Sequence, residues 1–420
     1  MAVVLAGALV LSGGQAASAS SGDWYYDDGG FEEIHERADG SGIRIAVLDT
    51  QINPTAPELA EANLNVREDS YCWDADMNPL PATATGDPGV HATSMIAMIS
   101  GTGDGINGQP GIRGIAPGAE VDHYAAMLPD SAKLNGENCA KAHEDGLSAS
   151  NAAFRDALES GANIISISAW LTIDSDWIAR AVAAGVIVVA AVGNEGIQWI
   201  AHPASYNGVV AVGSYGPEYL VSEFSNTGKE LGVVAPGEGV RSYTTAIDGY
   251  KESQGTSYSA AYVSGALALA WSAFPDASSN QILQLLVHNT GSQGATHEPV
   301  RDQEVGYGSL NIKAMLSDDP NNYEHEHPFV TEDNTEGPSV FEIEEARDDL
   351  IDQSVPTVSP TTSTVVANDA EPQSGDGSKT AVYIGVGVGV AILVFGVTLA
   401  VILVRRRQSV SSSAMIQEKQ

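Results

Sequence analysis

The chain has 420 residues, enough for one large domain or two ordinary ones, and its formal net charge at pH 7 is -35. A surface with so few basic groups has no positive face to neutralise phosphates, which argues against nucleic-acid binding. The charge suits an extracellular surface that stays dispersed by repulsion. Abundant glycine and sparse charge fit a compact α/β domain with many tight turns.

The N-terminal residues indicate a secretory signal peptide. Residues 2–11 form a short apolar run, and residues 17–19 (Ala-Ser-Ala) supply the small side chains of a cleavage site. We therefore assign residues 1–19 to a signal peptide and residues 20–41 to an N-terminal extension that packs on the following domain. The alternative to a signal peptide is that these first residues form a buried N-terminal helix.

Residues 42–316 alternate apolar runs with helical stretches. The runs, typical of strands buried on both faces, are 43–48, 163–169, 186–192 and 208–213. The helical stretches are 91–100, 150–160, 174–184, 259–271 and 280–288. This alternation predicts a three-layer α/β domain with a mostly parallel central sheet and helices on both faces. In such folds the ligand lies beyond the carboxyl ends of the strands.

Four polar residues stand at the ends of these elements. Asp49 ends the first predicted strand, and His91 begins a helical stretch. Asn194 lies between glycines after a buried strand, and Ser257 precedes the helix at 259–271. Each alone has an ordinary interpretation, as a turn residue, an exposed histidine or a helix cap. Four such residues in this order, each at the end of an element, are a stronger indication of a functional site than any one of them alone.

In this order the four residues and their neighbours resemble the subtilisin-like serine proteases, or subtilases. The matching segments are 49–52 (Asp-Thr-Gln-Ile), 91–93 (His-Ala-Thr), 114–119, 193–196, 224–228, 235–237 and 255–257 (Gly-Thr-Ser). The resemblance implies a subtilisin-like fold and a serine endopeptidase. It makes Ser257 the nucleophile, His91 the base and Asp49 the residue that orients it. It also implies that the Asn194 amide and the Ser257 backbone N–H form the oxyanion hole.

The sequence departs from the subtilase pattern at four positions, which are Gln51, Ala92, Trp170 and Ala261. Gln51 and Ala92 replace glycines, and Ala92 would be strained if its backbone needed a positive φ. Ala261 replaces a proline without touching a reacting group. The segment Ser168, Ala169 and Trp170 resembles the strand that lines the substrate cleft, where Trp170 replaces a glycine. We expect the bulky ring to restrict proteolysis to few substrates.

Cys72 and Cys139 both fall in the domain predicted to face outward. Two cysteines in a secreted chain usually pair, so we expect a disulfide, with two free thiols as the alternative. The bond would close a long loop and contribute about 3–4 kcal/mol on a loop-entropy estimate.

No cofactor is required by the expected chemistry, and we predict no metal site. Asp69, Asp74 and Asp76 are candidate ligands of a structural calcium ion, but we favour a solvated acidic insertion as their explanation.

The C-terminal residues predict a membrane anchor. Residues 317–380 are acidic and then rich in Ser, Thr and Pro, which predicts a disordered tether. Residues 381–404 are uncharged and long enough to cross a bilayer as a helix. The arginines at 405–407 predict that the tail, residues 405–420, stays in the cytoplasm. We expect a single-pass cell-membrane protein with its catalytic domain outside.

This layout resembles the mycosins, the membrane-anchored subtilases of type VII secretion systems. The resemblance implies polypeptide substrates and association with a secretion complex in the membrane. The alternative is a mainly structural component that stabilises such a complex, with proteolysis secondary or absent.

Overall fold

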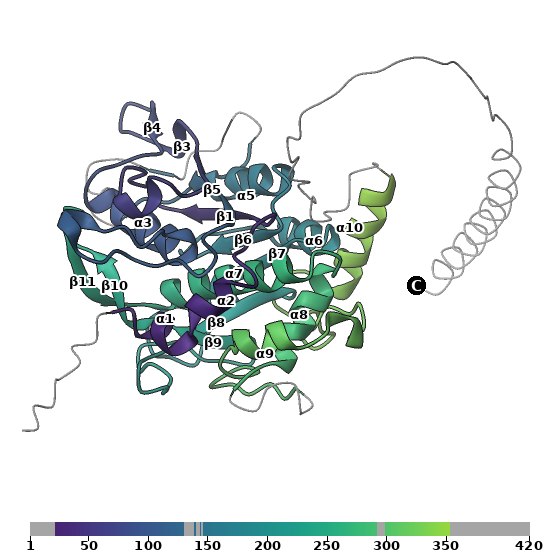
Figure 1. Cartoon of the computed structure of the whole chain (residues 1–420). Coiled ribbons are helices and arrows are strands. Elements are labelled where there is room, and N and C mark those ends of the chain that lie inside the picture. Colours follow the sequence, from purple (N-terminus) through teal and green to yellow (C-terminus); the bar gives the residue numbers. More distant parts are fainter. Residues whose placement is uncertain (1–21, 130–137, 140–142, 144–145, 292–298, 353–420) are drawn as a thin grey trace, which may run out of the picture. The chain divides into compact units, whose positions relative to one another are not determined.

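The computed structural model describes residues 22–129, 138–139, 143, 146–291 and 299–352 (Figure 1). Within these residues seven parallel strands form one sheet, in the order β2-β5-β1-β6-β7-β8-β9. Their bounds are β1 (Arg44–Asp49), β2 (Leu64–Val66), β5 (Glu120–Ala125), β6 (Ile164–Ile167), β7 (Ile187–Ala191), β8 (Val209–Tyr215) and β9 (Val233–Pro236). The predicted parallel sheet is therefore confirmed.

Two small antiparallel pairs lie outside the main sheet. They are β3 (Asp69–Trp73) with β4 (Pro79–Pro81), and β10 (Glu238–Tyr243) with β11 (Tyr250–Gln254). The disulfide Cys72–Cys139 joins β3 to the segment that follows β5, as predicted.

Helices cover both faces of the sheet (Figure 1). The larger ones are α3 (Asp87–Ser100), α5 (Ala149–Glu159), α6 (Ser175–Ala183), α7 (Thr256–Ala273) and α8 (Ser279–His288). The short ones are α1 (Trp24–Gly29), α2 (Phe31–His35) and α9 (Ile312–Ser317) with the 3-10 turns η1 (Pro57–Leu59), η2 (Ile106–Gly108) and η3 (Pro320–Asn322). In the core, α7 packs on α3 and on β6 to β9, whereas α5 and α6 form a second group on β1, β5 and β7.

Helix α7 is rich in small residues and is buried along nearly its whole length. A side chain at Gly265 would lie 2.8 Å from the Cβ of Ile115, so only glycine allows that close approach. The helix runs without a break through Ala261, so the missing family proline does not interrupt it. Its first turn lies at the carboxyl ends of the strands and carries Ser257.

The N-terminal extension packs on the domain through aromatic and ionic contacts. The rings of Tyr25 and Phe31 meet Tyr262 of α7 edge to face, with centroids 5.9 and 6.1 Å apart. Asp23 forms a largely buried ion pair with Arg241, with 3.2 Å between Oδ2 and Nε.

The chain remains folded beyond Leu316, where the sequence predicted a disordered tether. Asn207 exchanges two hydrogen bonds with the backbone of Thr331, and Phe329 is 2% exposed. Beyond them α10 (Val340–Asp352) packs on α6 and buries Ile343. The prediction is therefore wrong for residues 317–352. Isolated apolar residues in an acidic stretch have no periodicity, yet they suffice to attach it to a preformed surface.

The rest of the predicted tether, the signal peptide and the predicted membrane span 381–404 lie outside the described residues. Among the residues that are described, no helix is both long and apolar enough to cross a membrane.

Candidate active site

Asp49 is the last residue of β1, and its side chain is completely buried. Its backbone carbonyl accepts hydrogen bonds from the N–H groups of Ala126 and Met127, at 2.9 and 3.1 Å, which fixes the end of the strand. Its Oδ1 accepts the backbone N–H of Thr50 at 2.6 Å. Its Oδ2 is buried without a hydrogen-bond partner in the described part of the chain. The orientation of the carboxylate therefore depends on Oδ1.

His91 lies in the second turn of α3, where it meets Asp49. Its Nδ1 is 2.7 Å from Oδ1 of Asp49, while 37% of its side chain stays exposed. Burial by itself lowers the pKa of His91, but the charge of Asp49 and the hydrogen bond to it raise the pKa above its usual value. Because Nδ1 faces the acid, Nε2 is the nitrogen left to exchange a proton with a substrate or nucleophile.

Ser257 is the second residue of α7. Its hydroxyl donates to the backbone carbonyl of Ser168 at 2.7 Å, and the Ser168 hydroxyl donates to the carbonyl of Ser257 at 3.0 Å. This reciprocal pair joins the start of α7 to the segment after β6. The Ser257 hydroxyl must turn from the Ser168 carbonyl toward His91 before it can transfer its proton, a change common between a free enzyme and its substrate complex.

Asn194 follows β7 and is held by Thr256. Its Oδ1 accepts the Thr256 backbone N–H at 2.8 Å and the Thr256 hydroxyl at 3.0 Å. The amide is therefore anchored through its oxygen, which leaves the NH₂ group to donate elsewhere. A Cβ at Gly255 would lie 3.6 Å from Nδ2 of Asn194 and 3.9 Å from the backbone nitrogen of Ser257, so both donor atoms lie beside Gly255.

Two departures from the family pattern are accommodated without backbone strain. Ala92 is fully buried inside α3 and has no positive φ, so its methyl group is tolerated. Gln51 also avoids a positive φ, and its side-chain NH₂ donates to the carbonyl of Pro81 at 2.8 Å.

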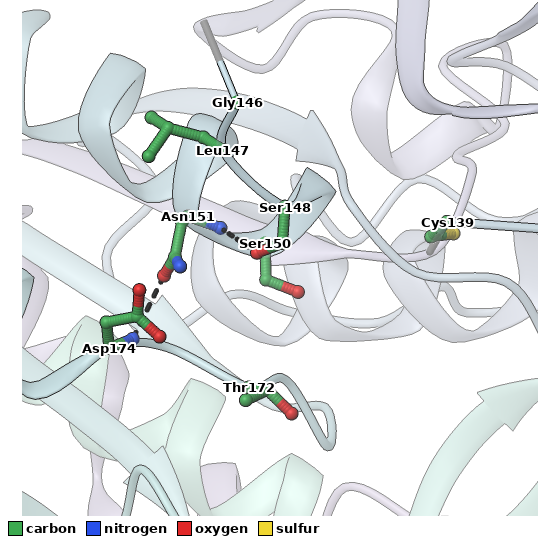
Figure 2. Close-up of a pocket in the computed structure, with 8 residues that line it drawn as sticks. All are labelled: Cys139, Gly146, Leu147, Ser148, Ser150, Asn151, Thr172 and Asp174. Atoms are coloured by element: carbon green, nitrogen blue, oxygen red, sulfur yellow. Dashed lines mark hydrogen bonds between the residues drawn. The ribbon is translucent and has the colours of Figure 1, made fainter. Parts of the chain in front are cut away.

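The segment after β6 passes from a buried to an exposed environment. Ser168 is buried, Ala169 is partly buried and Trp170 is 67% exposed. A cavity of about 420 Å³ lies between the continuation of this segment and the start of α5, and Figure 2 shows the residues that line it. Its described lining is Cys139, Gly146, Leu147, Ser148, Ser150, Asn151, Thr172 and Asp174. Asn151 joins its two sides, because its Oδ1 accepts the Asp174 backbone N–H at 2.9 Å.

Two of the candidate calcium ligands, Asp74 and Asp76, lie in a turn, whereas Asp69 begins β3. Oδ1 of Asp74 accepts the backbone N–H groups of Asp76 and Asn78, at 2.9 and 2.8 Å. No group of three or more His, Cys, Asp or Glu side chains suited to a metal occurs among the residues described.

Sequence reasoning missed Thr50, Thr256 and His123. The two threonines adjoin motif residues, so their positions could have been noticed. Nothing in the sequence marks His123, which is fully buried near the end of β5 with its Nε2 2.8 Å from the carbonyl oxygen of Thr50. Burial lowers the pKa of His123 to about 4, so its ring is neutral near pH 7.

Comparisons with known proteins agree with this geometry. The Subtilase family pattern matches residues 40–308. The chain is 34% identical over 239 residues to the major intracellular serine protease of Bacillus subtilis (strain 168), covering 55% of this chain and 68% of that protein. It is 31% identical over 263 residues to subtilisin BL of Lederbergia lenta, covering 61% of this chain and 87% of that one.

Among solved structures, the chain is similar to the MycP3 protease from the type VII (ESX-3) secretion system. The TM-score is 0.54 at 25% identity, over 70% of this chain and 87% of that one. The family match, the protease relatives and the shared fold lead to one conclusion: this chain belongs to the subtilase family and is a subtilisin-like serine endopeptidase.

Proposed function

We propose that Asp49, His91 and Ser257 are the catalytic triad of this endopeptidase. The 2.7 Å contact between His91 and a fully buried Asp49 is the observation that carries the proposal. Asp49 holds the proton on Nδ1 of His91, so that Nε2 is free to accept another.

In the acylation step, Oγ of Ser257 bonds to the scissile carbonyl carbon as its proton passes to Nε2 of His91. The imidazolium then gives that proton to the amine as the C–N bond breaks, leaving an ester on Ser257. Water attacks the ester with His91 again as base, which releases the acid and restores the serine.

Asn194 supplies one half of the proposed oxyanion hole. Its NH₂ group and the Ser257 backbone N–H both lie beside Gly255. Because Thr256 holds the amide oxygen, the donor is fixed before negative charge develops on the substrate oxygen.

We also infer that the protease cleaves only a restricted set of substrates. Trp170 presents an exposed ring on the segment that begins at Ser168, the hydrogen-bond partner of Ser257. The polar cavity of Figure 2 borders the same segment at Thr172 and carries the acidic residue Asp174. We infer that the ring narrows the cleft and that the cavity accepts a polar or basic substrate side chain.

We further propose that the protease is anchored in the cell membrane by residues 381–404, with the domain outside and the tail after residue 404 in the cytoplasm. The uncharged run and the arginines that follow it support this orientation. The similarity to a protease of a type VII secretion system supports a role beside such a membrane complex, acting on few polypeptides.

A fluorophosphonate probe tests the enzymatic proposal on the full-length chain. We expect the probe to label Ser257 and to leave a Ser257→Ala variant unlabelled. No labelling of the wild type, under conditions in which a known subtilase reacts, would contradict the triad. Secretion in cells that carry Ser257→Ala in place of the wild type then separates the two roles, because a mainly structural component would still support it.

A further inference from the structure

Thr50 contacts Asp49 and the peptide unit that joins His91 to Ala92 through different atoms. Its backbone N–H donates to Oδ1 of Asp49 at 2.6 Å. Its hydroxyl accepts the backbone N–H of Ala92, the residue after His91, at 3.3 Å. Since Oδ2 of Asp49 has no partner in the described residues, the Thr50 backbone N–H provides one of only two contacts that orient this carboxylate there.

His123 in turn holds the backbone at Thr50, through the carbonyl oxygen of the next peptide unit. It lies on β5 beside β1, paired with Val47, and its Nε2 is 2.8 Å from the carbonyl oxygen of Thr50. A carbonyl oxygen only accepts hydrogen bonds, so Nε2 carries the hydrogen and Nδ1 does not. The hydrogen bond to the Thr50 carbonyl therefore fixes the tautomer of His123.

The choice of histidine at this position needs an explanation. A parallel strand that is buried on both faces normally carries aliphatic side chains, as Val121 does on the same strand. His123 is fully buried, and its Nδ1 has no hydrogen-bond partner within the described residues. A buried polar atom without a partner destabilises a fold. Within the described residues, and besides an electrostatic interaction with Asp49, the hydrogen bond to Thr50 is the interaction of the ring that an aliphatic side chain could not make.

We propose that His123 is a positioning residue for proteolysis, which acts through the backbone at Thr50 on Asp49 and His91. The hydrogen bond fixes the peptide unit between Thr50 and Gln51, which follows directly after the unit whose N–H donates to Oδ1 of Asp49. Without it the backbone around Thr50 is less restrained, the Asp49 carboxylate loses a fixed contact, and the imidazole of His91 is held less firmly. This inference rests on the triad proposed above.

Three substitutions separate the hydrogen bond from simple packing. His123→Gln can place an amide N–H near the position of Nε2, whereas the shorter side chain of His123→Asn does not reach it. His123→Leu keeps an apolar side chain of similar size and has no donor. We expect kcat to fall about 10- to 100-fold in the Asn and Leu variants, with KM within about twofold, and to be largely restored in the Gln variant. Probe titration of active sites corrects for any inactive protein.

The pH dependence of kcat/KM distinguishes the loss of the hydrogen bond from a packing defect. A misplaced Asp49 raises the pKa of His91 less, so the acid limb of kcat/KM should move to lower pH in His123→Leu. Val121→Ala, a cavity in the same strand, should lower the melting temperature and leave the acid limb in place. If the Leu variant does not fold, the comparison of Gln with Asn decides the question.

The decisive measurement does not need turnover. Titration of the His91 ring by NMR, in full-length Ser257→Ala with and without His123→Leu, reports the contact with Asp49 directly. A lower pKa of His91 in the double variant supports the inference. An unchanged pKa with wild-type kcat overturns it while leaving the triad intact, and so does a Gln variant no better than Asn. A wild type without turnover would contradict the triad, and the titration would still test His123.

Discussion

Nδ1 of His91 lies 2.7 Å from Oδ1 of Asp49, and the carboxylate is completely buried while the imidazole is partly open to solvent. The arrangement stabilises the imidazolium, because the negative charge of Asp49 and its hydrogen bond outweigh the effect of burial on the pKa of His91. This balance has opposite consequences for activity and for stability.

Activity should decline on the acid side through a pKa above the usual value of about 6.5 for histidine, because only the neutral imidazole accepts the proton of Ser257. Asp49→Asn should move this limb to lower pH and reduce kcat by about 10⁴-fold, the loss typical of a misoriented triad histidine. The pH profile of kcat/KM checks both effects. Asp76→Asn, which alters an exposed carboxylate in a loop, should leave the profile unchanged.

Protonation of His91 lowers activity but should stabilise the fold. Because the folded state raises the pKa of His91, its protonation stabilises the fold fully below the unfolded pKa, and this contribution is lost as pH rises through the folded pKa. We therefore expect His91→Gln, compared with its parent in a Ser257→Ala background, to lower the melting temperature more at pH 5.5 than at pH 9. An equal loss at both values would be inconsistent with a raised pKa.

Asn194 allows a test of the oxyanion hole with two neighbouring substitutions. Asn194→Ala should reduce kcat by about 10²–10³-fold, the loss that follows removal of one such donor. Asn194→Asp keeps an oxygen for Thr256 but replaces the donor by a negative charge, so it should be worse. Steady-state kinetics on a peptide substrate compare the two. If Asp were as active as wild type, the NH₂ group would have no role in stabilising the oxyanion.

Much of the site could be predicted from sequence because its groups lie in short segments at element ends. Asp49, His91, Asn194 and Ser257 each belong to such a segment, and their order indicated the family. His123 could not be found that way, since its contact with Thr50 depends on the pairing of β5 with β1, which no local pattern specifies. The folding of residues 317–352 was not predicted for a similar reason, because their few buried apolar side chains are isolated among acidic residues.

Phe329 tests whether that segment belongs to the folded domain. Its buried ring lies edge to face with Tyr307, with centroids 5.8 Å apart, and a Cβ on Gly232 would come within 3.0 Å of it. Phe329→Ala should lower the free energy of unfolding by about 3–5 kcal/mol, as for other buried phenylalanines. The matched control is Phe341→Ala, whose ring is 69% exposed and which should change stability little. Urea unfolding measures the free energy of unfolding of both variants. If Phe329→Ala changed it as little as Phe341→Ala, the segment would contribute nothing to the stability of the domain.

Trp170 is the residue through which restricted specificity can be tested. Its ring is largely exposed, so Trp170→Gly should leave the melting temperature nearly unchanged apart from the added backbone freedom of glycine. If the ring narrows the cleft, the variant should degrade unfolded casein at more sites and faster than the wild type does, while its rate of fluorophosphonate labelling stays similar. Trp177→Gly provides the matched control, because that tryptophan lies on α6 with Arg180 over its ring. Mass spectrometry of the casein fragments counts the cleavage sites. An unchanged set of sites in Trp170→Gly, or broad cleavage by the wild type itself, would show that the ring does not limit access to Ser257.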